Sequence, residues 1–110
     1  MNWQPLTTEE QLVTINGLSR HQPVAIFKHS TRCSISGMIK MRLERAAVPA
    51  DVAFFYLDLI RYRNVSNRIA MDYGVEHESP QLLLIRDGQC IYHESHSGIS
   101  MDEVAEKAVL

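Results

Sequence analysis

Residues 24–36 read Val-Ala-Ile-Phe-Lys-His-Ser-Thr-Arg-Cys-Ser-Ile-Ser, and this stretch decides the fold of the chain. Its apolar beginning predicts a buried strand over 24–28. After Cys33, apolar residues recur at the spacing of a helix, which we expect to end near Ala47, before Pro49. Cys33 therefore stands where a strand turns into a helix.

This position favours reactivity of the Cys33 thiol. Unpaired backbone N–H groups and the positive end of the helix dipole favour the thiolate, which is the nucleophile. We expect Arg32, and Lys28 to a lesser degree, to act in the same direction. Ser36 occupies the place where a dithiol redox motif has its second cysteine. The motif Cys-x-x-Ser predicts a single-cysteine redox site, and the alternative is an inert, structural cysteine.

Composition narrows the class of protein. A chain of 110 residues, 45% hydrophobic and 22% charged, predicts one soluble domain over 1–110. The net charge of −2 gives no reason to expect nucleic acid or a membrane surface as a partner. The sequence has no run long enough to span a membrane and no signal peptide, so we expect a cytoplasmic protein with reduced cysteines at Cys33 and Cys90.

Caps, apolar runs and turns predict the other elements. Asp87-Gly88 is a strong hairpin turn, so the strands on either side of it must be antiparallel. In order we expect a helix over 8–18 with a capping box of Thr7 and Glu10, a strand over 52–57, a helix from Asn64 or Ser66 to Tyr73 that Gly74 ends, strands over 82–85 and 90–93, and a helix after the cap pair Ser100 and Glu103.

This order of elements is similar to that of thioredoxin-like proteins. The expected fold is α/β, with a central mixed four-stranded sheet of parallel strands plus a C-terminal antiparallel hairpin, flanked by about four helices. Ser79-Pro80 precedes the third of these strands. It matches the place where thioredoxin-like proteins hold a cis-proline beside the active cysteine, so we expect a cis bond there.

The chain also resembles a narrower group, the monothiol bacilliredoxin family of the YtxJ type. The resemblance covers about residues 5 to 110, with one departure: Ser34 stands where the family commonly has proline directly after the cysteine. The matching tracts are Lys28-His29-Ser30-Thr31 with Cys33, Ile35 and Ser36, then 62–67, then Gly74-Val75 with 77–81, then Asp87-Gly88.

The resemblance implies an enzyme that works through one cysteine and the small thiol bacillithiol. Cys33 matches the family's cysteine, and Ser36 the position of a resolving cysteine. The implied substrates are S-bacillithiolated proteins, with free bacillithiol as co-substrate and no bound cofactor. We expect Arg32, Ser79 and Pro80 to contact the substrate. Loop arginines at 61 and 63 are weaker candidates for the carboxylates of bacillithiol.

Two other functions remain open. One is a non-catalytic thioredoxin-fold binding module in which Cys33 is a relic. The other is an iron–sulfur carrier like the monothiol glutaredoxins, although these typically read Cys-Gly-Phe-Ser and this chain does not. We expect no metal site, because the histidines lack ligand spacing. We expect Cys90 to be structural, Met38 and Met41 to pack ordinarily, and His29 to form hydrogen bonds.

Overall fold

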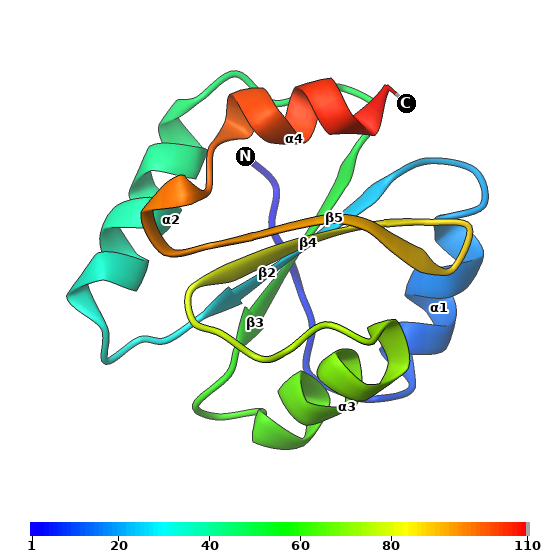
Figure 1. The fold of residues 1–110 in the computed structure, drawn as a ribbon, viewed down its shortest axis with the longest axis horizontal. Helices are drawn as coiled ribbons and strands as arrows, with labels where there is room; N and C mark the ends of the chain where they lie inside the picture. Colours follow the sequence, from blue (N-terminus) through cyan, green and yellow to red (C-terminus); the bar gives the residue numbers. More distant parts are fainter. Residues whose placement is uncertain (110) are drawn as a thin grey trace.

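The computed structural model describes residues 1–109, and a mixed sheet lies at its centre between two layers of helices (Figure 1). No helix in this part of the chain is both long and apolar enough to cross a membrane. The strands are β1 (Gln4–Pro5), β2 (Val24–His29), β3 (Ala53–Asp58), β4 (Gln81–Arg86) and β5 (Gln89–Ser95). The helices are α1 (Gln11–Leu18), α2 (Ser34–Arg45), α3 (Arg63–Tyr73), the short 3-10 helix η1 (His96–Gly98) and α4 (Met101–Ala108).

The five strands lie in the order β1-β3-β2-β4-β5. β2 and β3 are parallel, and β4 is antiparallel both to β2 and to β5, so the predicted parallel pair and hairpin are confirmed. The sheet has one strand more than expected, because β1 pairs with the edge of β3. A two-residue strand that contains Pro5 has neither the alternation nor the composition that predicts a strand.

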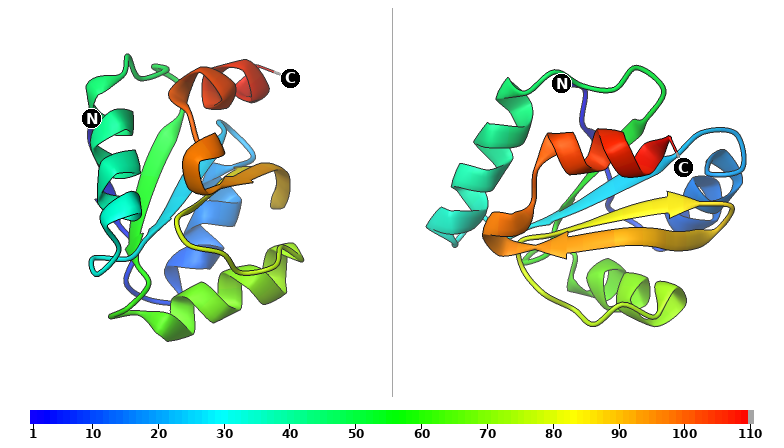
Figure 2. Two further views of the ribbon diagram at one scale, coloured as in Figure 1. Left: turned by 60° about the vertical axis from the view of Figure 1, so that its left-hand side comes forward. Right: turned by 45° about the horizontal axis from the view of Figure 1, so that its top comes forward.

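Successive side chains of the central strands point into opposite helical layers. Val24 and Ile26 pack in the layer of α1 and α3, whereas Ala25 and Phe27 pack in the layer of α2 and α4. Figure 2 shows the two helix pairs on opposite sides of the sheet. Burial on both faces explains why β2, β3 and β4 have nearly continuous apolar sequences.

The beginning of α1 differs from the prediction. The capping box of Thr7 and Glu10 does not form: Glu10 is the N-cap residue, and its side chain makes no capping hydrogen bond. Instead, Oε1 of Gln11 accepts hydrogen bonds from the backbone N–H groups of Thr7 (2.7 Å) and Thr8 (3.0 Å). The side-chain amide of Gln11 therefore fixes the backbone just before the helix, which starts at Gln11 itself.

Three further helix ends test the predicted caps. α3 begins at Arg63, and neither Asn64 nor Ser66 caps it, because Ser66 lies inside the helix with its side chain fully buried. Gly74 ends α3 in the left-handed conformation, at φ 65°, as predicted. Ser100 caps α4, with its Oγ accepting from the N–H of Glu103 at 3.3 Å.

Candidate active site

Cys33 is the N-cap residue of α2, directly beyond the C-terminal end of β2. Its backbone is extended, at φ −107° and ψ 118°, and its carbonyl accepts the first helical hydrogen bond from the N–H of Gly37 at 3.1 Å. Its own N–H donates to the carbonyl of Ser30 at 3.1 Å, which fixes the turn. The partly exposed thiol therefore sits at the helix start, where backbone N–H groups lack partners.

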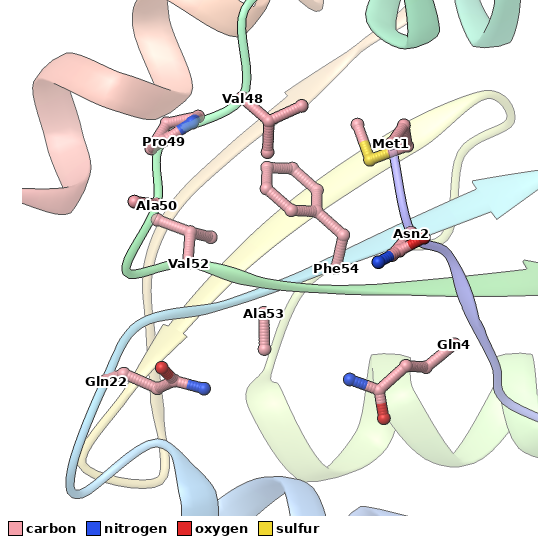
Figure 3. A pocket seen from close by; sticks show the side chains of 10 residues that line it. All are labelled: Met1, Asn2, Gln4, Gln22, Val48, Pro49, Ala50, Val52, Ala53 and Phe54. Atoms are coloured by element: carbon pink, nitrogen blue, oxygen red, sulfur yellow. The ribbon is translucent and has the colours of Figure 1, made fainter.

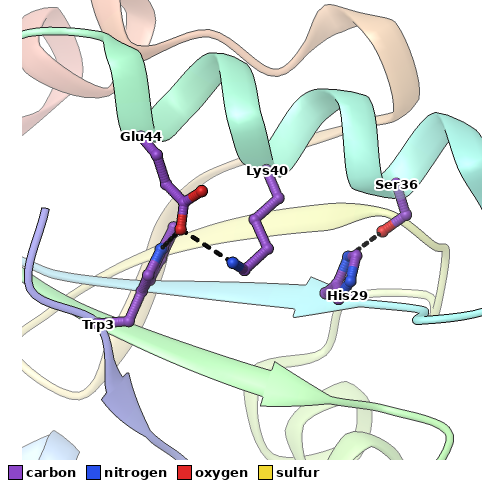
Figure 4. Close-up of polar contacts among 5 residues, drawn as sticks. All are labelled: Trp3, His29, Ser36, Lys40 and Glu44. Atoms are coloured by element: carbon purple, nitrogen blue, oxygen red, sulfur yellow. Dashed lines mark hydrogen bonds and ion pairs between the residues drawn. The ribbon is translucent and has the colours of Figure 1, made fainter.

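Ser36 lies in the first turn of α2, but its side chain points into the protein and is fully buried. The Ser36 hydroxyl lies 2.6 Å from Nδ1 of His29, and its oxygen accepts a hydrogen bond from the N–H of Ser30 at 3.1 Å. Figure 4 shows the serine turned toward the histidine beneath it. Ser36 thus ties α2 to the end of β2.

His29 is almost fully buried beneath α2. Its ring contacts those of Phe27, at 6.0 Å, and Tyr56, at 5.6 Å, measured between ring centroids. Burial lowers the pKa of His29 below its ordinary value, and the positive charge of Lys40 lowers it further. The neutral imidazole carries one N–H donor and one acceptor nitrogen, and the hydroxyl can serve as either partner, so the Nδ1–Ser36 hydrogen bond forms with either tautomer of the ring.

The contact between Ser36 and His29 was not predicted from the sequence. Strand alternation was sufficient to place His29 on the same face as Ala25 and Phe27, toward α2. The helical phase of Ser36, three residues before the buried Ile39, placed the serine on the inner face of α2. Only the combination of both periods indicates that the two side chains meet.

The peptide bond between Ser79 and Pro80 is cis, as expected. Gln81 in β4 lies opposite Lys28 in β2, so continuing this register places Pro80 beside His29. Pro80 therefore lies at the edge of the sheet from which the chain enters the Cys33 turn. The Pro80 carbonyl accepts from the N–H of His96 at 2.9 Å, whereas Oγ of Ser79 is buried without a hydrogen-bond partner in residues 1–109.

The two cations predicted to assist Cys33 lie in different environments. Arg32 is exposed directly before the cysteine. Lys28 is fully buried, and its ammonium group points into the layer of α3, where it lies 3.3 Å from the carbonyl of Ser66 and 3.4 Å from Nδ1 of His77. Burial lowers the pKa of Lys28 to about 8. Lys28 thus supports the loop that leads to Pro80 and does not face the turn of Cys33.

Cys90 lies at the other end of the sheet. It pairs with Ile85 in β4, and Ile85 is opposite Val24 at the start of β2, whereas Cys33 follows the end of that strand. Both cysteines are free thiols. Burial raises the pKa of Cys90, and its Sγ donates to the carbonyl of Tyr92 at 3.3 Å. These contacts agree with a structural role for this residue.

An open pocket of about 450 Å³ also lies at that far end (Figure 3). None of its lining side chains is ionisable, so it offers no group for thiol chemistry. In the part of the chain that the structure describes, no three His, Cys, Asp or Glu side chains gather into a possible metal site. The pocket is lined by Met1, Asn2, Gln4, Gln22, Val48, Pro49, Ala50, Val52, Ala53 and Phe54.

Comparison with solved structures agrees with this geometry. A thioredoxin-fold protein proposed to be an oxidoreductase is 26% identical, with a TM-score of 0.77, over 94% of this chain and 90% of that one. The thioredoxin of Fasciola hepatica is 18% identical, with a TM-score of 0.72, over 96% of each chain. The thioredoxin of Malassezia sympodialis is 15% identical, with a TM-score of 0.75, over 98% of this chain and 89% of that one.

Comparison with protein families points to a narrower group than the fold alone does. The model of the monothiol bacilliredoxin family BrxC matches residues 4–104, which include the Cys33 turn, the Ser79–Pro80 bond and all five strands. This match spans most of the chain and confirms the resemblance that the sequence motifs indicated. The fold and the family together identify a thiol redox protein. The chain belongs to the monothiol bacilliredoxin family.

Proposed function

We propose that this protein removes bacillithiol from protein mixed disulfides through Cys33 alone. The observation that carries the proposal is the contrast within one helical turn: the Cys33 thiol is partly exposed, whereas the position of a resolving cysteine holds Ser36, buried and bonded to His29. Cys90 lies at the opposite end of the sheet. An adduct on Cys33 therefore has no neighbouring thiol within the chain to displace it.

The reaction follows from this arrangement in two exchanges. In the first, the Cys33 thiolate attacks the bacillithiol sulfur of the mixed disulfide. A new S–S bond forms, the old one breaks, and the substrate cysteine leaves as a thiolate that takes a proton from water. In the second, the thiolate of free bacillithiol attacks the bacillithiol sulfur on Cys33. Bacillithiol disulfide leaves, Cys33 is again a thiolate, and free bacillithiol is the reductant of the whole cycle.

Substrate contacts are assigned to the groups around the thiol. Arg32 is exposed beside Cys33 and can pair with a carboxylate of bacillithiol. The backbone of Ser79 makes no backbone hydrogen bond within residues 1–109 and can pair with an extended substrate next to Pro80. Arg61 and Arg63, exposed near the start of α3, are further candidates for the carboxylates.

The test uses one carrier protein with a single cysteine, prepared as its mixed disulfide with bacillithiol, with glutathione or with cysteine. Removal of each small thiol is followed by intact mass, beside the Cys33→Ser variant. We expect fastest removal of bacillithiol and no removal by the variant. Equal rates for all three disulfides would refute the preference for bacillithiol. A protein inert toward all three would support a binding module, and a brown protein after purification without oxygen would support an iron–sulfur carrier.

A further inference from the structure

The outer face of α2 contradicts one expectation from the sequence. Met38 and Met41 do not pack ordinarily: 69% and 51% of their surfaces are exposed, as is 53% of Ile35. The three side chains recur every third residue, so they form one ridge along the helix that begins at Cys33. This surface, the α2 ridge, consists of Ile35, Met38 and Met41.

The α2 ridge borders a hollow between α2 and η1. A cavity of about 570 Å³ is lined by these three residues together with Ile39, Arg42, Arg45 and Ser97. Arg42 donates to the carbonyls of Ser97 and Ile99, and these bonds hold η1 against the helix. Carbonyl oxygens do not neutralise the guanidinium charge. An exposed apolar ridge beside a formed hollow is typical of a surface that binds another protein.

The charges around the hollow indicate the chemistry of its partner. Its only charged lining residues are Arg42 and Arg45, and Arg45 makes no ion pair among the described residues. The one acidic residue of α2, Glu44, lies on the other side of the helix, where it pairs with Lys40 at 2.9 Å and accepts from Trp3 at 2.8 Å (Figure 4). A partner that presents carboxylates next to apolar side chains would complement this surface.

The same charges disfavour a second copy of this chain as the occupant. A symmetric dimer places the same patch on both sides of the interface. Two copies that met over the α2 ridge would therefore bring Arg42 and Arg45 toward their own symmetry mates without an acidic residue in the lining. A different protein avoids this repulsion. The substrate of Cys33 must already approach the start of this helix, so it is the protein most readily brought against the ridge.

We propose that the α2 ridge and its two arginines form a docking surface that selects protein substrates with apolar and acidic residues close to the modified cysteine. This inference rests on the proposed function, because it assumes that Cys33 exchanges disulfides with proteins. It adds a substrate class: small disulfides react without the ridge, whereas proteins and peptides depend on it.

The experiment compares kcat/KM for three peptides, each of which carries one central cysteine as its mixed disulfide with bacillithiol. The first peptide has leucines flanking the cysteine and glutamates at both ends. The second differs from the first only in having lysines at the ends, and the third differs from the first only in having serines in place of the leucines. Bacillithiol disulfide, exchanged with isotopically labelled bacillithiol, is the small-molecule control. We expect kcat/KM for the first peptide to exceed those for the other two at least fivefold. Equal values for all three would overturn the proposal.

Variants separate docking from a disturbed helix. The double variant Met38→Gln with Met41→Gln should lower kcat/KM for the first peptide about tenfold and leave exchange of bacillithiol disulfide unchanged. The matched control is Val13→Gln with Met71→Gln, whose apolar residues are 76% and 73% exposed on α1 and α3. An equal loss in both double variants, or an equal loss on the small disulfide, would contradict a docking surface.

Reversing the charge at Arg45 tests whether its positive charge selects acidic substrates. Arg45→Glu should lower kcat/KM for the peptide with glutamates and raise it for the peptide with lysines, whereas the exposed control Arg20→Glu should change neither. A change of kcat/KM in the same direction for both peptides would refute selection of acidic substrates by the charge of Arg45. If wild-type protein exchanged no disulfide, the proposed function would fail. Fluorescence anisotropy of the labelled peptides without bacillithiol would then test the docking surface separately. A docking surface on α2 predicts tighter binding of the acidic, leucine-containing peptide than of the other two.

Discussion

The hydroxyl of Ser36 lies 2.6 Å from Nδ1 of His29, in the place where a dithiol redox protein carries its resolving sulfur. The same oxygen accepts from the N–H of Ser30 at 3.1 Å. The serine therefore joins the start of α2, the end of β2 and the turn that holds Cys33. This single side chain accounts both for the fixed geometry of the turn and for the missing second thiol.

Replacing Ser36 by alanine should destabilise the protein by about 1–3 kcal/mol, because it leaves the Ser30 N–H and the His29 ring nitrogen buried without a partner. Chemical denaturation followed through the fluorescence of Trp3, the single tryptophan of the chain, measures this change. The exposed Ser97→Ala variant serves as a control. A loss no larger than that of the control would show that the bonds of Ser36 contribute nothing to stability.

His29 should make stability depend on pH below neutrality. Burial, and then the charge of Lys40, lower its pKa in the folded state. Above the unfolded-state pKa of about 6.5 the imidazole is neutral in both states, and its contribution to stability is fully present. As the pH falls from there toward the folded-state pKa, the unfolded state binds more protons and stability is lost. Unfolding free energies from pH 7.5 to 5 should fall less steeply in His29→Gln.

Lys28 should make stability depend on pH above neutrality. Its folded-state pKa of about 8 lies below its ordinary 10.5, so folding expels a proton between these values and stability rises with pH across that interval. At pH 7 the group is charged in both the folded and the unfolded state, so the full cost of burying the charge is present. We expect Lys28→Met to be more stable than wild type at pH 7, and the difference to shrink by pH 10. A difference independent of pH would contradict the lowered pKa.

Ser34 occupies the first helical position of α2, a position at which proline is favoured in helices. Cys33 before it is extended at ψ 118°, a conformation that a following proline permits. Ser34→Pro should therefore raise the unfolding free energy by about 0.5–1 kcal/mol, because it restricts the unfolded chain without costing a helical hydrogen bond. Thermal unfolding checks this result. A lower midpoint would show that the Ser34 N–H or hydroxyl has a partner in solution.

Cys90 should be dispensable for exchange. Its raised pKa and its bond to the Tyr92 carbonyl predict slower alkylation by iodoacetamide than at Cys33, as measured by peptide mass spectrometry at pH 7.5. Cys90→Ala should retain full removal of bacillithiol and lose about 1 kcal/mol of stability. Loss of turnover with retained folding would instead assign Cys90 a resolving role.

Much of the fold could be predicted because the patterns that determine it are local. The apolar run before Lys28, the helical spacing after Cys33 and the Asp87-Gly88 turn each specify an element on their own. The order of these elements then restricts the topology to few arrangements. Cys33 could be placed at a helix start for the same reason.

The remaining features depend on contacts that join distant positions. The amide of Gln11 binds the backbone before its helix, and the predicted cap by Thr7 does not form, a choice between two side chains that spacing does not decide. The bond between Ser36 and His29 requires a strand phase and a helix phase to agree. Lys28 is buried because α3 and His77 cover it, and nothing within the strand sequence indicates that cover.

The proposed mechanism requires that Cys33 carries bacillithiol and that no thiol within the chain can release it. Its most direct test is a single turnover of reduced protein with an equal amount of bacillithiolated carrier, followed by intact mass without added thiol. We predict that one bacillithiol accumulates on Cys33 as the carrier is freed, and that it stays until free bacillithiol is added. Loss of the adduct without added thiol, with an internal disulfide in its place, would contradict the monothiol account.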